Sequence, residues 1–137
     1  MKRGISLILA ALFSMGSWSS PTERPTARPV RFETGQSSFS VRDSLKGDQF
    51  IDYAVRGKAG QTLRVKLKSS NSSNYFNVLP PDNHDALFVG SIEGNEWTAP
   101  IHADGIYTVR VYLMRNAARR GEQAQFTLTI DIASNEK

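Results

Sequence analysis

The sequence of 137 residues contains no cysteine and only two histidines, His84 and His102. Without cysteine the chain cannot form disulfide bonds, thiolate metal sites or a cysteine nucleophile. Two histidines supply few of the ligands that a zinc site needs and few groups for acid–base catalysis. We therefore predict that the protein is not an enzyme and that it uses no metal and no cofactor.

Long hydrophobic runs are also lacking, except for one near the start. Residues 5–13 are apolar apart from Ser6, they follow the basic residues Lys2 and Arg3, and small residues come after them. This order is typical of a secretory signal. The run is shorter than the about 20 apolar residues that span a bilayer. We predict a signal peptide at 1–20, a periplasmic or secreted protein, and no membrane span after cleavage.

Basic side chains outnumber acidic ones only slightly, 17 to 13. The formal net charge is +4, and removing the two basic residues of the signal, Lys2 and Arg3, reduces it to +2. A net charge this small gives no electrostatic reason to expect a nucleic-acid partner.

Three of the six prolines fall between residues 21 and 29. Proline fixes φ and has no N–H to donate, so this stretch favours an extended, solvated leader. The predicted organisation is a signal peptide at 1–20, a Pro-rich leader at 21–29 and a single domain at 30–137.

Apolar and polar residues alternate through most of the remaining chain. Alternation with a period of two places one set of side chains in a core and the other in water. Glycine-, proline- and asparagine-rich turn signals separate the runs. The sequence therefore predicts an all-β fold, an antiparallel β-sandwich of seven or eight short strands, with no long helix. The clearest alternating runs are 39–45, 51–56, 63–68, 107–113 and 126–132.

Few residues offer catalytic or metal-binding chemistry. His84 stands among Asp82, Asn83 and Asp85, but their spacing is not that of a calcium loop, and Pro80–Asn83 is already a good turn. No serine lies in a Gly-x-Ser-x-Gly motif. The sequence therefore predicts no active site and no metal site.

Two polar segments are distinctive. The first runs from Ser69 to Phe76, where small hydroxyl and amide side chains lead into aromatics, as in many binding loops; a flexible connector is the alternative.

The second polar segment runs from Arg110 to Gly121 and carries four arginines. Clustered guanidiniums need water, carboxylates or an acidic partner. The alternative is a solvated hairpin with one arginine bound to a neighbouring carboxylate.

Part of the second segment resembles a known family. Residues 104–111, Asp-Gly-Ile-Tyr-Thr-Val-Arg-Val, continue through Arg-Asn-Ala-Ala-Arg at 115–119 to the alternating run at 126–132. This combination resembles the periplasmic inhibitors of goose-type (g-type) lysozyme, and the similarity extends back to about Phe39. The resemblance implies an antiparallel β-sandwich, secretion to the periplasm, and inhibition by loops that enter the substrate cleft of the lysozyme.

The predicted function is therefore inhibition of a lysozyme, with the g-type as the expected target. Lysozymes cleave glycans with a carboxylic acid in the cleft, which a guanidinium would neutralise. Arg115 and Arg119 are expected to make this contact, with Asn116 as hydrogen-bonding support, and Arg120 is expected to belong to the same lysozyme-binding surface. The second inserting loop is expected to present Ser70, Asn71, Ser72, Ser73 and Tyr75.

Two alternatives remain open from the sequence. One is a carbohydrate- or peptidoglycan-binding sandwich in which Trp97, Tyr112 and Tyr75 stack on sugar rings. The other is a structural accessory domain of the bacterial envelope. An exposed aromatic strip would favour sugar binding, and a protruding arginine hairpin would favour inhibition.

Overall fold

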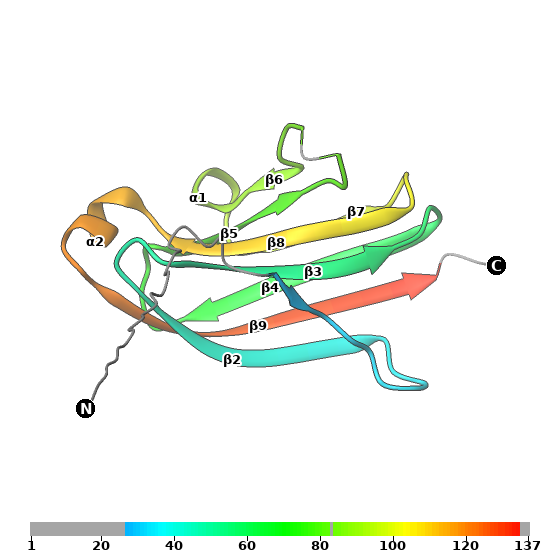
Figure 1. The fold of residues 1–137 in the computed structure, drawn as a ribbon, viewed down its shortest axis with the longest axis horizontal. Helices are drawn as coiled ribbons and strands as arrows, with labels where there is room; N and C mark the ends of the chain where they lie inside the picture. The colour runs from blue at the N-terminus through cyan, green and yellow to red at the C-terminus, as the bar shows by residue number, and fades with distance from the viewer. Residues whose placement is uncertain (1–26, 83, 135–137) are drawn as a thin grey trace, which may run out of the picture.

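The computed structural model describes residues 27–82 and 84–134. The predicted signal peptide and most of the predicted leader lie outside the described residues. Two β-sheets pack face to face in this part of the chain (Figure 1). Except for the pairing of β1 with β3, neighbouring strands within each sheet are antiparallel, which confirms the predicted all-β sandwich.

Nine strands and two short helices make up the described fold. Sheet A has the strand order β1 (Arg28–Pro29), β3 (Phe50–Gly57), β8 (Gly105–Leu113), β5 (Asn74–Leu79) and β6 (Phe88–Val89). Sheet B has the order β2 (Ser38–Lys46), β9 (Gln123–Ser134), β4 (Gln61–Ser69) and β7 (Glu96–Pro100). The helices are α1 (Gly90–Glu93) and α2 (Arg115–Arg119).

The core lies between the sheets and follows from the alternation in the sequence. On β8, Val109 and Val111 are fully buried, while on β9 the buried side chains include Leu128 and Ile130. These strands belong to opposite sheets, so the two sets face inward from both sides, as expected for aligned sheet packing.

Three details differ from the sequence-based expectation. The structure adds two-residue strands, β1 and β6, to the predicted seven or eight. Strand β1 falls at 28–29, within the predicted leader, and pairs in parallel with Tyr53 and Ala54. Proline is tolerated there because β1 is an edge strand. Finally, β8 and β9 are in different sheets, so the arginine-rich segment does not form the β-hairpin that the sequence left open: a single helical turn, α2, connects the two strands.

A polar contact closes the edge where β1 and β2 meet. Asp43 sits between Val41 and Leu45 on the inward side of β2, opposite Phe126 of β9. The hydroxyl of buried Tyr53 donates a hydrogen bond to Asp43 Oδ2 at 3.2 Å, and Arg28 forms an ion pair with the same oxygen. The three side chains therefore link both edge strands to β3.

The pKa of Tyr53 predicts how the protein behaves in alkali. Burial of the ring, followed by the negative charge of Asp43, raises this pKa from 10.0 to about 12. The unfolded chain therefore releases the phenolic proton at a lower pH than the folded chain. Stability that is fully present below about pH 10 is lost as the pH rises towards 12, by on the order of 2 kcal/mol.

We expect Tyr53→Phe to remove most of this alkaline decline, as measured by urea unfolding at about pH 8 and about pH 11.5. Tyr75→Phe is the matched control and should leave the decline in place, since Tyr75 lies on the outer side of β5 and does not contact Asp43. A decline of wild-type size in Tyr53→Phe would show that another group causes it.

Candidate functional site

Three connections that cross between the sheets meet at one end of the sandwich, which we call the α2 end. They are β2–β3 (47–49), β4–β5 (70–73) and β8–β9 (114–122). In Figure 1 all three lie on the left, with α2 at the tip. The fold thus brings the two polar segments singled out from the sequence to the same end.

Main-chain hydrogen bonds hold the β8–β9 connection between the other two. The Gly47 N–H donates to the Glu122 carbonyl at 2.9 Å, and the Met114 N–H donates to the Ser73 carbonyl at 2.9 Å. Gly47 has φ of 62°, a left-handed conformation that side chains other than glycine rarely adopt. The Lys-Gly turn therefore fixes where the β2–β3 connection meets α2.

Asn71 joins the β4–β5 connection to the end of the β8–β9 connection. Its Nδ2 donates to Glu122 Oε1 at 3.0 Å and to the Gln123 carbonyl at 3.0 Å. Its Oδ1 accepts a hydrogen bond from the Ser73 N–H at 2.8 Å. The hydrogen bond from Asn71, together with one from Arg120, lowers the pKa of the Glu122 carboxyl. Asn71 thus braces the site from within.

We expect Asn71→Ala to lower the free energy of unfolding by about 1–2 kcal/mol, because two side-chain hydrogen bonds between connections are lost. Equilibrium unfolding in urea measures this change. Ser72→Ala is the control: Ser72 is exposed and makes no side-chain hydrogen bond with the described residues, so its stability should match that of wild type. Equal stability of both variants would show that Asn71 does not brace the loop.

Helix α2 directs its polar side chains outward. Ala117 is completely buried and anchors the helix, whereas Arg115, Asn116, Arg119 and Arg120 are exposed. Arg120 Nε donates to Glu122 Oε2 at 2.7 Å. Among the described residues, the guanidiniums of Arg115 and Arg119 have no hydrogen bond and no ion pair.

The placement of Arg115 and Arg119 is unfavourable for the isolated protein. Residues four apart on a helix are neighbours, and like charges at this spacing repel. Neither cation has a partner among the described residues, so these two side chains add no polar contact to the fold.

Arg110 does not belong to this group. It lies on β8, and its guanidinium binds both oxygens of Asp52 on β3, at 2.8 and 2.9 Å. The same guanidinium carbon is 4.4 Å from the centre of the Phe50 ring. The hydrogen bonds to Asp52, and the negative charge of Asp52, raise the pKa of Arg110 against the opposing effect of burial. The sequence-based cluster of four arginines thus separates into two paired and two unpaired side chains.

The three aromatic residues proposed to form a sugar-binding strip are not together. Tyr75 and Tyr112 are adjacent on β5 and β8, both half-buried on the outer side of sheet A. Trp97 is on β7 of sheet B, where it packs against the core, with its ring 6.1 Å from that of Phe88. Phe50 of β3 pairs with Tyr112, so Phe50, Tyr112 and Tyr75 form a row of three aromatic side chains on the outer side of sheet A. Only the pairing of β3 with β8 brings Phe50 there, so no local signal in the sequence identifies it.

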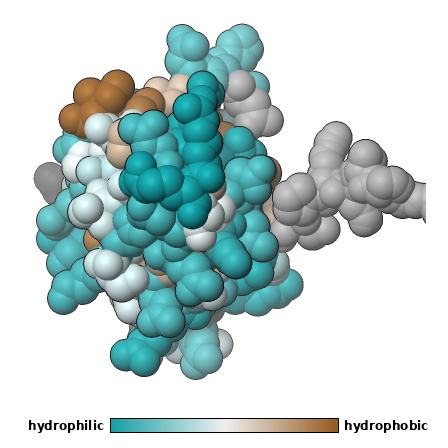
Figure 2. All heavy atoms as spheres, turned by 90° about the vertical axis from the view of Figure 1, so that its left-hand side faces the viewer, coloured by the Kyte–Doolittle hydropathy of each residue, from teal (hydrophilic) through white to brown (hydrophobic). Residues whose placement is uncertain are grey.

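Seen end-on, the α2 end is largely hydrophilic, with one hydrophobic patch near the upper edge (Figure 2). The most exposed large hydrophobic side chain of the described residues is Ile92 of α1, at 80%. The sequence analysis missed it, because one isoleucine between serine and glutamate has no distinguishing pattern.

Neither a metal site nor a membrane span is found in residues 27–82 and 84–134. No three His, Cys, Asp or Glu side chains of this part gather closely enough to hold a metal ion. The His84 N–H donates to Asp82 Oδ1 at 3.0 Å, as in an ordinary turn. No helix in the same ranges has the length and hydrophobicity needed to cross a bilayer.

Comparison with known proteins shows the family. No protein-family model matches the chain. It is 26% identical over 104 residues to an inhibitor of g-type lysozyme from Escherichia coli, covering 75% of this chain and 78% of that protein. A crystal structure of a periplasmic inhibitor of g-type lysozyme from Salmonella Typhimurium matches with a TM-score of 0.60 and 25% identity, over 78% of this chain and 99% of the other.

A second solved inhibitor is more similar. The crystal structure of the periplasmic inhibitor of g-type lysozyme from Aeromonas hydrophila is 34% identical, with a TM-score of 0.72, and the match covers 80% of this chain and 97% of that one. The resemblance noted in the sequence is thereby confirmed. A shared β-sandwich, this level of identity and nearly complete coverage of the relative show that the chain belongs to the family of periplasmic inhibitors of g-type lysozyme.

Proposed function

We propose that this protein acts in the periplasm as an inhibitor of a g-type lysozyme and that it inserts the α2 end into the substrate cleft of the enzyme. The observation that carries the proposal is the pair of exposed guanidiniums of Arg115 and Arg119, one turn apart on α2, neither of which has a partner among the described residues. The relatives with the same fold are named as inhibitors and not as enzymes, which supports a role in binding.

Arg115 and Arg119 supply the chemistry of the proposed contact. The catalytic acid of a lysozyme is a carboxyl group in a cleft. A guanidinium binds a carboxylate with two parallel hydrogen bonds and holds it in the charged form, which cannot donate a proton to the leaving oxygen. The exposed amide of Asn116 is placed on the same turn to hydrogen-bond neighbouring groups of the enzyme.

The β4–β5 connection supplies the second part of the proposed contact surface. Ser70 and Ser72 are exposed, and Ser73 and Tyr75 are half-buried beside them. Hydroxyl groups adapt to varied hydrogen-bond partners, and a tyrosine adds contact area with few rotatable bonds. Because Asn71 and the main-chain bonds already order both connections, little conformational entropy is lost on binding.

A lytic assay tests the proposal. The mature chain is titrated into purified g-type, chicken-type and invertebrate-type lysozymes acting on a suspension of cell walls. We expect lysis by the g-type enzyme to fall in proportion to the inhibitor added until the enzyme is saturated. Undiminished lysis by g-type enzymes at a large molar excess of the chain would refute the proposed function.

A further inference from the structure

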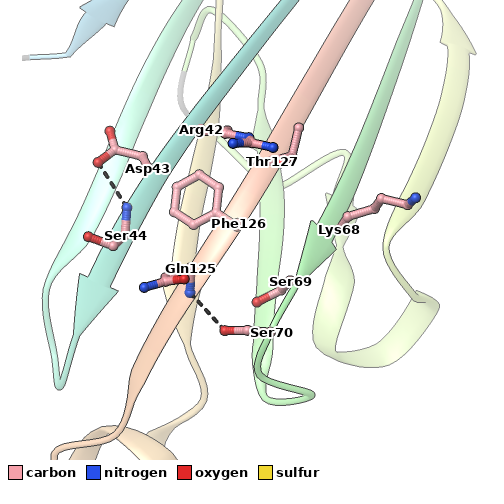
Figure 3. Close-up of a pocket in the computed structure, with 9 residues that line it drawn as sticks. All are labelled: Arg42, Asp43, Ser44, Lys68, Ser69, Ser70, Gln125, Phe126 and Thr127. Atoms are coloured by element: carbon pink, nitrogen blue, oxygen red, sulfur yellow. Dashed lines mark hydrogen bonds between the residues drawn. The ribbon is translucent and has the colours of Figure 1, made fainter.

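We propose that the outer side of sheet B carries a second site, next to the α2 end, that binds a glycan bearing carboxylates. The site is a shallow hollow of about 600 Å³ over strands β2, β9 and β4. Figure 3 shows Arg42 and Thr127 at one side of this hollow, Lys68 on β4, and Ser70 beside Gln125. The hollow is defined by Arg42, Ser44, Lys68, Ser70, Gln125 and Thr127.

The strand register places these side chains in two rows across the sheet. Thr127 of β9 pairs with Arg42 of β2 on one side and with Lys68 of β4 on the other. The next row along β9 contains Gln125, which pairs with Ser44. Adjacent strands lie about 4.8 Å apart, so the two cations are attached to backbones roughly 10 Å apart with a hydroxyl between them.

Both cations are available to a ligand. Arg42 and Lys68 are exposed, and neither forms an ion pair or a side-chain hydrogen bond with the described residues. Asp43, which also borders the hollow, uses its carboxylate to bind Arg28 and Tyr53. Within the described residues, the hollow therefore has two positive charges without a partner, while the adjacent negative charge of Asp43 is already compensated.

The rest of this sheet face also has an excess of positive charge. Cations on the outward positions of β2 and β4 outnumber the acidic groups on β7 and β9. The outward cations are Arg42, Lys46, Arg64, Lys66 and Lys68, and the acidic groups are Glu96 and Asp131. Among these cations, Arg64 alone forms an ion pair with another described residue, Glu96, at 3.5 Å. The excess of positive charge favours a negatively charged partner.

The neutral groups of the hollow identify the class of partner. Serine and threonine hydroxyls and the Gln125 amide donate and accept hydrogen bonds, which suits sugar hydroxyls and amides. Phe126 borders the hollow but is buried, so no aromatic ring is available for stacking. Single-stranded nucleic acids depend on such rings. A carboxylated glycan, with acid groups for Arg42 and Lys68 and hydroxyls for the groups between them, fits best.

The bacterial cell-wall polymer has this chemistry, because the peptides attached to its sugars carry free carboxylates, as do lactyl groups that bear no peptide. Ser70 belongs both to the hollow and to the β4–β5 connection, so the hollow borders the α2 end. A cell-wall strand bound in the hollow would hold the protein on the polymer that lysozymes cut. The proposal does not depend on inhibition, since wall binding is measured without any lysozyme.

Co-sedimentation with insoluble peptidoglycan tests the site. The mature chain is mixed with peptidoglycan, with peptidoglycan whose carboxyls have been amidated, and with chitin, and the bound fraction is measured at low and high salt. Soluble polygalacturonate as a competitor separates a general carboxylated glycan from the wall polymer alone. The variant is Arg42→Gln/Lys68→Gln. The matched control, Arg56→Gln/Lys58→Gln, removes the same charge from exposed positions at and just beyond the end of β3, on the side of the sandwich away from the α2 end.

We expect wild type to bind peptidoglycan in a salt-sensitive manner and to bind the amidated polymer and chitin weakly. Arg42→Gln/Lys68→Gln should lower the affinity about fivefold or more, and the control less than about twofold. Competition by polygalacturonate would show that the hollow binds carboxylated glycans in general. A lack of competition would show that it binds the wall polymer specifically. Absence of binding, equal binding to the amidated polymer, or equal losses in both double variants would overturn the proposal.

Discussion

Replacing Arg115 or Arg119 by alanine should weaken inhibition of a g-type lysozyme about 30-fold or more and leave the melting temperature unchanged. Truncating one partner of a buried, charged contact at an interface costs roughly 2–5 kcal/mol. Neither guanidinium binds another described group in the free protein, so the fold loses no contact. The inhibition constant and the melting curve of each variant check both parts.

Two further variants make this test specific. Lysine at position 115 or 119 keeps the charge but lacks the planar fork, so it should restore only part of the inhibition. Arg64→Ala is the control, since Arg64 is half-exposed on β4 with a single long contact to Glu96. Inhibition constants equal to wild type in Arg115→Ala and Arg119→Ala would remove α2 from the mechanism. Losses that parallel a lower melting temperature would give these arginines a structural role.

Replacing Val111 by aspartate should prevent stable folding or lower the free energy of unfolding by about 3–5 kcal/mol. Val111 is completely buried on β8, the central strand of sheet A, between Ile51 of β3 and Phe76 of β5. These neighbours are apolar and buried, so the new carboxylate would lie in the core with no positive partner. Urea unfolding, or the yield of folded protein, measures the loss.

Thr108→Asp is the matched control on the same strand. Thr108 alternates with the buried positions 107 and 109 and is only partly buried. A charge there remains in contact with water, so the change in stability should be within about 1 kcal/mol. A Val111→Asp protein as stable as Thr108→Asp would mean that the inward and outward sides of β8 are reversed.

The sequence was sufficient for the long strands but not for the short elements. Alternation along 107–113 and 126–132 is a signal that does not depend on other parts of the chain, and both segments are strands. Helix α2 has only five residues, fewer than two helical turns, so no helical periodicity can develop. Strand β1 contains Pro29, which locally favours a loop, and only its pairing with β3 makes it part of the sheet.

The sequence predicted which segments make up the candidate site but not how their side chains are arranged and paired. The sequence identified both polar segments, and the fold places them at one end. Which arginines are paired depends on strand register: Asp52 binds Arg110 only because β3 pairs with β8 at those residues. The same reason explains why Trp97 was wrongly grouped with Tyr75 and Tyr112, since β7 belongs to the other sheet.

The way in which the connections are braced separates the part of the α2 end that holds its shape from the part that faces outward. Main-chain bonds of Gly47, Ser73 and Glu122, with the amide of Asn71, fix the positions of the connections. The side chains of Ser72, Arg115 and Arg119 take no part in this framework. Under the proposed function, substitutions at these three positions would change recognition of the enzyme at little cost in folding, so the contact surface could adapt by point mutation when the target enzyme changes.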